Sequence, residues 1–219
     1  MPEPLSIAIF SDPICPWCFL GKRRLERALD ELGLRGAATL RWLPFELNPD
    51  MPEAGMERAA YRAGKFGADR AAALDREMTA LGLQEGISFA LERMGRTPNT
   101  RKAHLLIAFA SRRGLGSAAV EALFAAYFED GRDIGAEHVL AEIGAGIGLD
   151  REAVQAALDD QTLRASIVDL EQEAARLGIA GVPFFIINDA WSVSGAQPTD
   201  AWLEVLQQIP NLEAEVPVG

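Results

Sequence analysis

The sequence is poor in the side chains that hold small proteins together covalently or through metal ions. Its 219 residues include only two cysteines and two histidines. A disulfide framework needs more cysteines, and a structural zinc site needs about four cysteine or histidine ligands at suitable spacing. His104 and His138 lie in separate predicted helices and do not complete such a set. We therefore predict no bound metal.

Long hydrophobic runs and positive charge are also scarce. No apolar stretch reaches the roughly 18 residues of a membrane-spanning helix, and the first residues lack the basic segment of a secretory signal. The chain has 21 lysines and arginines against 32 aspartates and glutamates, a formal net charge of −11. Such a chain repels nucleic-acid phosphates and anionic lipids. We expect a cytoplasmic protein whose partners are neither nucleic acids nor membranes.

The composition is otherwise that of a globular protein. Hydrophobic residues make up 49% and charged residues 24% of the chain, close to the averages for folded domains. The length suits one large domain, or one domain that carries a sizeable insertion.

The first part of the chain predicts a strand, a helix and a second strand. Residues 5–10 form a short apolar run that is typical of a buried strand. Residues 16–32 have apolar side chains at helical spacing, and Gly33 is a stop signal. Residues 39–43 predict the second strand, which Pro44 ends.

The rest of the chain predicts a helical block followed by a hairpin and a helix. Turn-forming residues at 48–55 mark a boundary, and alanine-rich sequence continues from there to about residue 177. The clearest elements are helices at 100–113, 117–128 and 161–177, paired strands at 184–187 and 191–194, and a last helix capped by Thr199.

The pair Cys15 and Cys18, separated by Pro16 and Trp17, is the sharpest chemical feature. Only a thiolate exchanges a disulfide, and a second thiol must lie close enough to close the ring. A helix start meets both needs, because its free N–H groups stabilise a thiolate. Pro16 suits the first helical position, and Trp17 offers substrate an apolar contact. Half of a zinc site and a pair of ordinary buried cysteines are the two alternatives.

Five sequence blocks resemble DsbA-like oxidoreductases, specifically their FrnE-like branch. The blocks are FSDPICPWCFLGK at 10–22, PFELNP at 44–49, PNTRKAH at 98–104, GVPFF at 181–185 and VSGAQ at 193–197.

The resemblance implies an α/β, thioredoxin-like fold with an inserted all-helical domain. Its first part would span 1–48, the insertion 49–160 and its second part 161–219. The resemblance also implies reversible thiol–disulfide exchange with protein or small-molecule thiols and disulfides, with Cys15 and Cys18 as the catalytic pair. No permanently bound cofactor is expected, and glutathione is a candidate co-substrate. Nothing in the sequence predicts the oligomeric state.

Further site residues follow from the same resemblance. Pro183 matches the cis-proline that faces the redox pair in this superfamily, and it would expose the backbone of Val182 to a substrate strand. Pattern alone favours a trans proline at the start of an edge strand.

Asp12, Asn48 and His104 are weaker candidates for proton transfer or for the substrate groove. A turn or capping role for Asp12 and a buried, hydrogen-bonded role for His104 are the alternatives. The superfamily's buried carboxylate, six residues before the first cysteine, is replaced here by Ile9, so Asp12 or Glu46 could substitute for it.

Two other functions compete with the oxidoreductase interpretation. One is a glutathione-dependent isomerase or transferase of the hydroxychromene-carboxylate or kappa type, which would need no second cysteine. The other is a peptide-binding holdase with regulatory cysteines. The Pro16-Trp17 dipeptide lacks the histidine of strongly oxidising relatives, and it therefore predicts a less oxidising pair.

Overall fold

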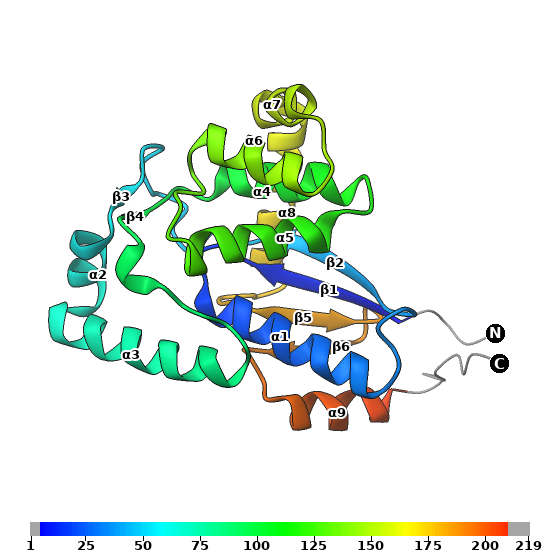
Figure 1. Ribbon diagram of the computed structural model, residues 1–219. Coiled ribbons are helices and arrows are strands. Elements are labelled where there is room, and N and C mark those ends of the chain that lie inside the picture. Colours follow the sequence, from blue (N-terminus) through cyan, green and yellow to red (C-terminus); the bar gives the residue numbers. More distant parts are fainter. Residues whose placement is uncertain (1–4, 210–219) are drawn as a thin grey trace.

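The computed structural model describes residues 5–209, and its centre is a four-stranded sheet in the order β2-β1-β5-β6 (Figure 1). β1 pairs in parallel with β2 and antiparallel with β5, and β5 pairs antiparallel with β6. The bounds are β1 (Ser6–Ser11), β2 (Thr39–Pro44), β5 (Phe184–Ile187) and β6 (Trp191–Ser194). All four strands lie where the sequence predicts them, and Pro44 closes an edge strand, where a missing N–H is tolerated.

Alternation along β1 explains why helices cover both faces of this sheet. Ile7 and Ile9 pair with Ile187 and Phe185 and belong to the main core. Phe10 points to the other face, where it belongs to a second, smaller core cluster. Because side chains alternate along a strand, the continuous apolar run of β1 supplies both faces.

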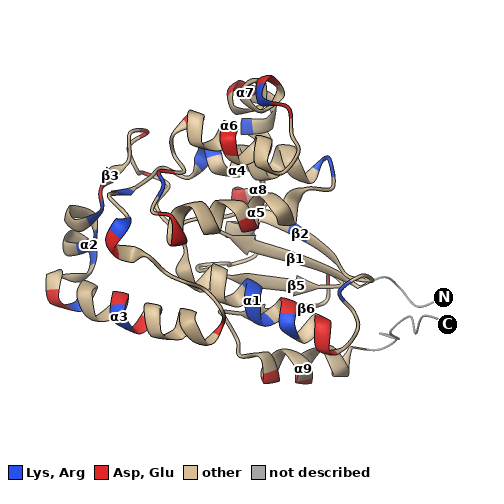
Figure 2. Ribbon diagram, in the orientation of Figure 1, with Lys and Arg blue, Asp and Glu red and all other residues tan. Residues whose placement is uncertain are grey.

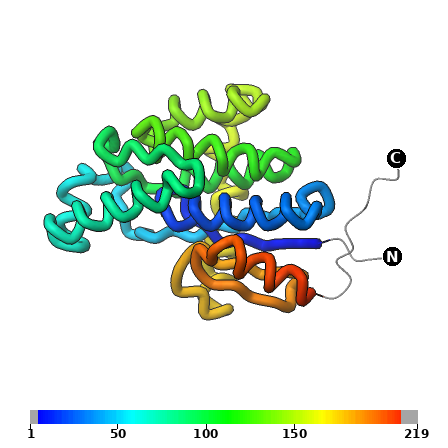
Figure 3. The backbone as a smooth tube through the Cα atoms, turned by 60° about the horizontal axis from the view of Figure 1, so that its bottom comes forward, coloured from blue at the N-terminus to red at the C-terminus, as the bar shows by residue number. Residues whose placement is uncertain are grey.

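Helix α1 (Pro16–Glu31) lies on the main-core face beside α9 (Thr199–Gln208), as the tube in Figure 3 shows. Cys15 is its N-cap residue, and Gly33 just beyond its end has a φ of 67°. These are the start and stop that the sequence predicts, since glycine adopts positive φ without strain.

Most of the chain between β2 and β5 is helical. The helices are α2 (Arg58–Phe66), α3 (Ala68–Gln84), α4 (Arg101–Ser111), α5 (Gly116–Phe124), α6 (Glu137–Gly146), α7 (Arg151–Asp159) and α8 (Gln161–Arg176). None of the helices within residues 5–209 is long and apolar enough to cross a membrane.

Two details in this region differ from the helices that the sequence predicts. Two-residue strands, β3 (Met56–Glu57) and β4 (Arg96–Thr97), pair antiparallel. The helix predicted at 117–128 is α-helical only to Phe124 and continues as a π-helical turn over Ala125–Glu129. Such a turn redirects side chains, and π-helical turns are frequent at functional sites.

The inserted helices are held against α1 by aromatic packing and ion pairs. Phe19 stacks on Phe124 with ring centroids 4.9 Å apart. Lys22 is buried and binds Glu121 of α5 at 2.6 Å and Glu26 at 2.8 Å. The helix that carries both cysteines is therefore fixed to the insertion as well as to the sheet.

The start of the last helix corrects one prediction. The N-cap residue of α9 is Pro198, and Thr199 is the first residue of the helix. No side chain caps this helix start. The Pro198 carbonyl accepts the N–H of Trp202 at 3.1 Å, so the chain enters the helix directly after the proline. A proline in extended conformation suits that place because it has no N–H to satisfy.

Candidate active site

Cys15 lies at the junction of the β1 loop and α1, with the extended backbone of an N-cap residue. Its thiol points to the carbonyl oxygen of Val182, with Sγ and O 3.7 Å apart. Cys15 and Cys18 are both free thiols. Within residues 5–209 no group of three or more histidine, cysteine, aspartate or glutamate side chains could hold a metal ion. The zinc alternative therefore has no such ligand set in the described chain.

Cys18 lies one helical turn further on and is almost completely buried. Burial raises the pKa of its thiol well above the ordinary value, and so do the hydrogen bond to Cys15 and the charge of Cys15. The Ser11 hydroxyl and the Asp12 backbone N–H donate to Cys18 and oppose this shift. Ser11 is a site residue that the sequence did not reveal.

The loop opposite the cysteines contains a cis peptide bond between Val182 and Pro183, as the resemblance implies. The loop approaches α1 at Gly21, where an added Cβ would lie 2.9 Å from Cγ of Pro183. Only a residue without a side chain permits this approach. Gly21 thus allows the Val182 carbonyl to face Cys15, a role that no local pattern indicates.

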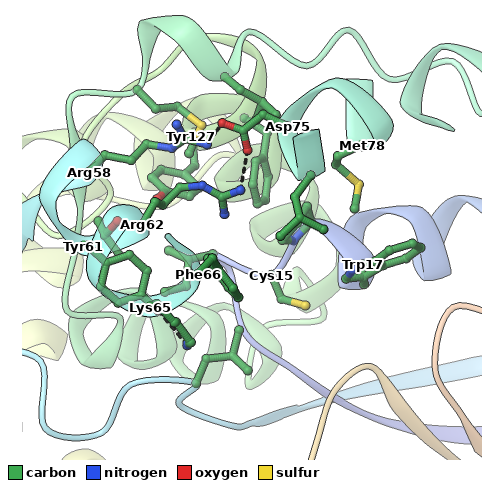
Figure 4. Close-up of a pocket in the computed structure, with 18 of the residues that line it drawn as sticks. Cys15, Trp17, Arg58, Tyr61, Arg62, Lys65, Phe66, Asp75, Met78 and Tyr127 are labelled. Atoms are coloured by element: carbon green, nitrogen blue, oxygen red, sulfur yellow. Dashed lines mark hydrogen bonds and ion pairs between the residues drawn. The ribbon is translucent and has the colours of Figure 1, made fainter. Parts of the chain in front are cut away.

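Cys15, Pro16 and Trp17 open on a cavity of about 440 Å³ (Figure 4). Trp17 lies at the edge of the cavity and is 41% exposed. The opposite wall comes from α2, α3 and the π-helical turn. Among the side chains lining it are Asn48, Arg58, Tyr61, Arg62, Lys65, Phe66, Asp75, Met78, Tyr127 and Val182. Of the sequence-predicted residues, four line this cavity together with Cys15: Pro16, Trp17, Asn48 and Val182. Pro183 follows Val182 in the chain and is not among the lining residues.

Asn48 belongs to the wall of this cavity and not only to a turn. Its Oδ1 accepts hydrogen bonds from the Tyr61 hydroxyl at 2.7 Å and from Nζ of Lys65 at 3.2 Å. This network connects the end of the β2 loop to α2, which lies within the predicted insertion.

Asp12 and His104 meet in the interior and do not line the cavity. Nε2 of His104 lies 4.0 Å from Oδ1 of Asp12, whose carboxylate accepts the backbone N–H groups of Ile14 and Leu47. Burial raises the pKa of Asp12 to about 7 and lowers the pKa of His104 to about 4. Both groups are therefore neutral over much of the range between these values. The turn-binding role of Asp12 is what these contacts show.

Glu46 and Asn99 serve the surrounding structure. Glu46 is buried and receives two hydrogen bonds from Arg101, at 2.9 and 2.8 Å. Asn99 accepts the N–H of Arg101 at the start of α4 and donates to the Met51 carbonyl. Asn99 thus satisfies a free N–H at the start of α4 from the position before the N-cap residue, Thr100.

A reduced cysteine pair at a strand–helix junction, facing a cis-proline loop in a four-stranded sheet, defines the thioredoxin-fold class of thiol–disulfide proteins. The model of the DSBA-like thioredoxin domain family matches residues 6–207. This chain belongs to that family, which confirms the DsbA-like resemblance and the thioredoxin-like fold with a helical insertion.

Three solved structures illustrate the relationship. A probable DsbA oxidoreductase from Streptomyces coelicolor is 32% identical, with a TM-score of 0.86 over 93% of this chain and 89% of that one. The cytosolic disulfide reductase DsbM from Pseudomonas aeruginosa with GSH is 23% identical (TM-score 0.66, 92% and 97% covered). A 2-hydroxychromene-2-carboxylate isomerase is 16% identical (TM-score 0.68, 92% of each chain). The last two show a shared fold only.

Proposed function

We propose that this chain is a dithiol–disulfide oxidoreductase in which Cys15 attacks and Cys18 resolves. The positions of the two thiols support this proposal most strongly. Cys15 is the N-cap of α1 and lines the cavity, whereas Cys18 is buried behind it and does not line the cavity. Both thiols have little exposed surface, but only that of Cys15 lines the cavity, which makes it the sulfur that a substrate disulfide in the cavity meets.

The reaction proceeds in two exchanges. The Cys15 thiolate forms a bond with one substrate sulfur, and the substrate's S–S bond breaks to release a thiolate. Cys18 then loses its proton to that thiolate or to water and attacks Cys15, which releases the second substrate thiol. The substrate disulfide gains two electrons, and the Cys15–Cys18 pair becomes a disulfide.

Val182 and Trp17 are the proposed substrate contacts. The Val182 carbonyl already accepts the Cys15 thiol, so it is accessible to a donor at the reacting sulfur. An extended substrate segment would pair with this backbone in the manner of an added strand. The exposed ring of Trp17 adds an apolar contact at the cavity edge.

Glutathione is the thiol that we propose to return the pair to its reduced state, in a cytoplasmic setting. The fold shared with a cytosolic disulfide reductase that was solved with GSH supports this choice. The Pro16-Trp17 dipeptide is consistent with a pair poised for a reducing compartment.

Single-cysteine variants test the proposal. Cys15→Ser should abolish the reduction of insulin disulfides, because no accessible thiolate remains. Cys18→Ser should accumulate a mixed disulfide with its substrate, visible as a mass adduct that dithiothreitol removes. Since the chain has only two cysteines, any adduct of Cys18→Ser is on Cys15. Full insulin reduction by Cys15→Ser would contradict the proposal.

A glutathione-dependent isomerase is the second candidate, because an isomerase of hydroxychromene carboxylate shares the fold. The buried second thiol, hydrogen-bonded to Ser11 and Cys15, favours the redox function since isomerisation needs only one thiol. Cys18→Ala separates the two candidates. Glutathione-dependent turnover of an aromatic carboxylate by this variant would favour the isomerase.

A further inference from the structure

The wall of the cavity opposite Cys15 is positively charged in a chain whose net charge is −11. Arg58, Arg62 and Lys65 have helical spacing along one face of α2, and all three line the cavity. Figure 2 shows that α2 carries basic but no acidic residues. Four basic and two acidic side chains line the cavity in total. The sign of charge beside the reactive thiol is therefore opposite to that of the whole chain.

These basic side chains are only partly neutralised by the protein. Arg58 and Arg62 share one carboxylate, that of Asp75, at 2.9 and 2.6 Å. Lys65 binds the Tyr61 hydroxyl at 2.7 Å and the Asn48 amide oxygen, and it has no carboxylate partner among residues 5–209. The cavity wall therefore retains positive charge.

Two buried donors in the same wall have no acceptor. Nδ2 of Asn48 and Nε of Arg62 are buried and make no hydrogen bond with the described chain. Both residues line the cavity. Buried donors normally have a partner, because leaving one unpaired costs free energy. In this conformation both atoms are closed to the cavity, so an oxygen acceptor of a ligand would reach them only after their side chains turn.

We propose that the cavity selects small disulfides that carry carboxylate groups near the S–S bond. This inference rests on the proposed function of Cys15 and names its substrate class. Carboxylate oxygens would pair with Lys65 and with the incompletely neutralised Arg58 and Arg62, while the S–S bond meets Sγ of Cys15. The chemistry is the exchange already described: one carboxylate-bearing thiolate leaves when Cys15 attacks, and the second when Cys18 attacks.

The size of the cavity sets the scale of this substrate. A volume of about 440 Å³ is within the range of small-molecule sites. It accommodates a small thiol compound or the end of a peptide, whereas a folded protein could present only a protruding segment.

A charge series of small aliphatic disulfides tests the inference. The fully reduced full-length chain is mixed with 3,3′-dithiodipropionate (anionic), 2-hydroxyethyl disulfide (neutral) or cystamine (cationic). Loss of free thiols is followed by rapid alkylation and mass spectrometry. Each rate is divided by the rate of the same disulfide with dithiothreitol, which removes differences in intrinsic reactivity.

We expect the normalised rates to fall from the anionic to the neutral to the cationic disulfide, with an anion-to-neutral ratio of about threefold to tenfold. Lys65→Gln should lower that ratio by about threefold, and Lys65→Glu should invert the order. Arg151→Gln removes a positive charge from α7 without touching the cavity, and should leave the ratio unchanged. An ionic strength of about 1 M should erase most of the preference.

The charge series distinguishes an error in the substrate class from an error in the proposed function. Equal normalised rates for the three disulfides, or a ratio in Lys65→Glu equal to that in the wild type, would overturn the substrate class while leaving the oxidoreductase proposal intact. Failure of all three disulfides to oxidise the cysteine pair would overturn the proposed function itself.

Discussion

Asp12 should make the folded protein more stable as the pH falls from about 7 to about 4. Its carboxyl group is completely buried, and burial raises its pKa from 3.8 to about 7 in the folded chain. In this window the folded state binds a proton that the unfolded state has released. Stability therefore increases as the pH is lowered through the window, and the gain is complete below the unfolded pKa.

The size of this change in unfolding free energy follows from the pKa shift of Asp12. Each unit of difference in pKa corresponds to about 1.4 kcal/mol, so a shift from 3.8 to about 7 corresponds to about 4 kcal/mol. Asp12→Asn removes the titration. It also removes one of the two acceptor oxygens used by Ile14 and Leu47, which lowers stability by about 1 kcal/mol at every pH.

The measurement is urea unfolding under reducing conditions between pH 4 and pH 8, for the wild type and for Asp12→Asn. The difference between the two unfolding free energies should change by up to about 4 kcal/mol across this range. His104 acts in the opposite direction, because its pKa is lowered from 6.5 to about 4 and stability is lost as the pH falls through that interval. Repeating the pair of measurements with His104→Gln in both chains removes this contribution. Parallel pH profiles for the two chains would contradict a raised pKa of Asp12 in the folded state.

Two further substitutions test the contacts around the site. Gly21→Ala should destabilise the fold by about 1–2 kcal/mol in urea unfolding, because the clash with Pro183 exceeds the gain in helix propensity. Unchanged stability would contradict the close approach of Pro183 to α1 at Gly21. Arg101→Met should cost about 2–3 kcal/mol by leaving the buried carboxylate of Glu46 without its partner. In this case Glu46→Gln on the same background should restore part of the loss, and a further decrease would contradict the explanation.

The local features of the site could be predicted from the sequence because they depend on neighbours along the chain. A cysteine pair two residues apart, a proline at the first helical position and an apolar run just before them are sufficient to place Cys15 at a helix start. Gly33 ends the same helix for an equally local reason. The family signature around Cys15 and Pro183 extended this prediction to the opposite loop.

Two details of the helices could not be predicted from the local pattern. The sequence predicts Thr199 as the cap of the last helix, but Pro198 occupies that position, because both residues are compatible with a helix start when only the local pattern is considered. The sequence predicts ordinary helix over the π-helical turn at Ala125–Glu129, since the composition of this segment is that of an α-helix.

The identity and order of the reactive groups can thus be predicted from the sequence: Cys15 at a helix start, Cys18 one turn on, and a proline loop far along the chain. Their surroundings depend on the tertiary structure. It buried Asp12 against His104, brought Gly21 under Pro183, and placed the basic face of α2 across a cavity from Cys15. The physical reason is that burial, pKa and charge at a site depend on which remote segments pack together, whereas helix starts and stops depend on a few adjacent residues.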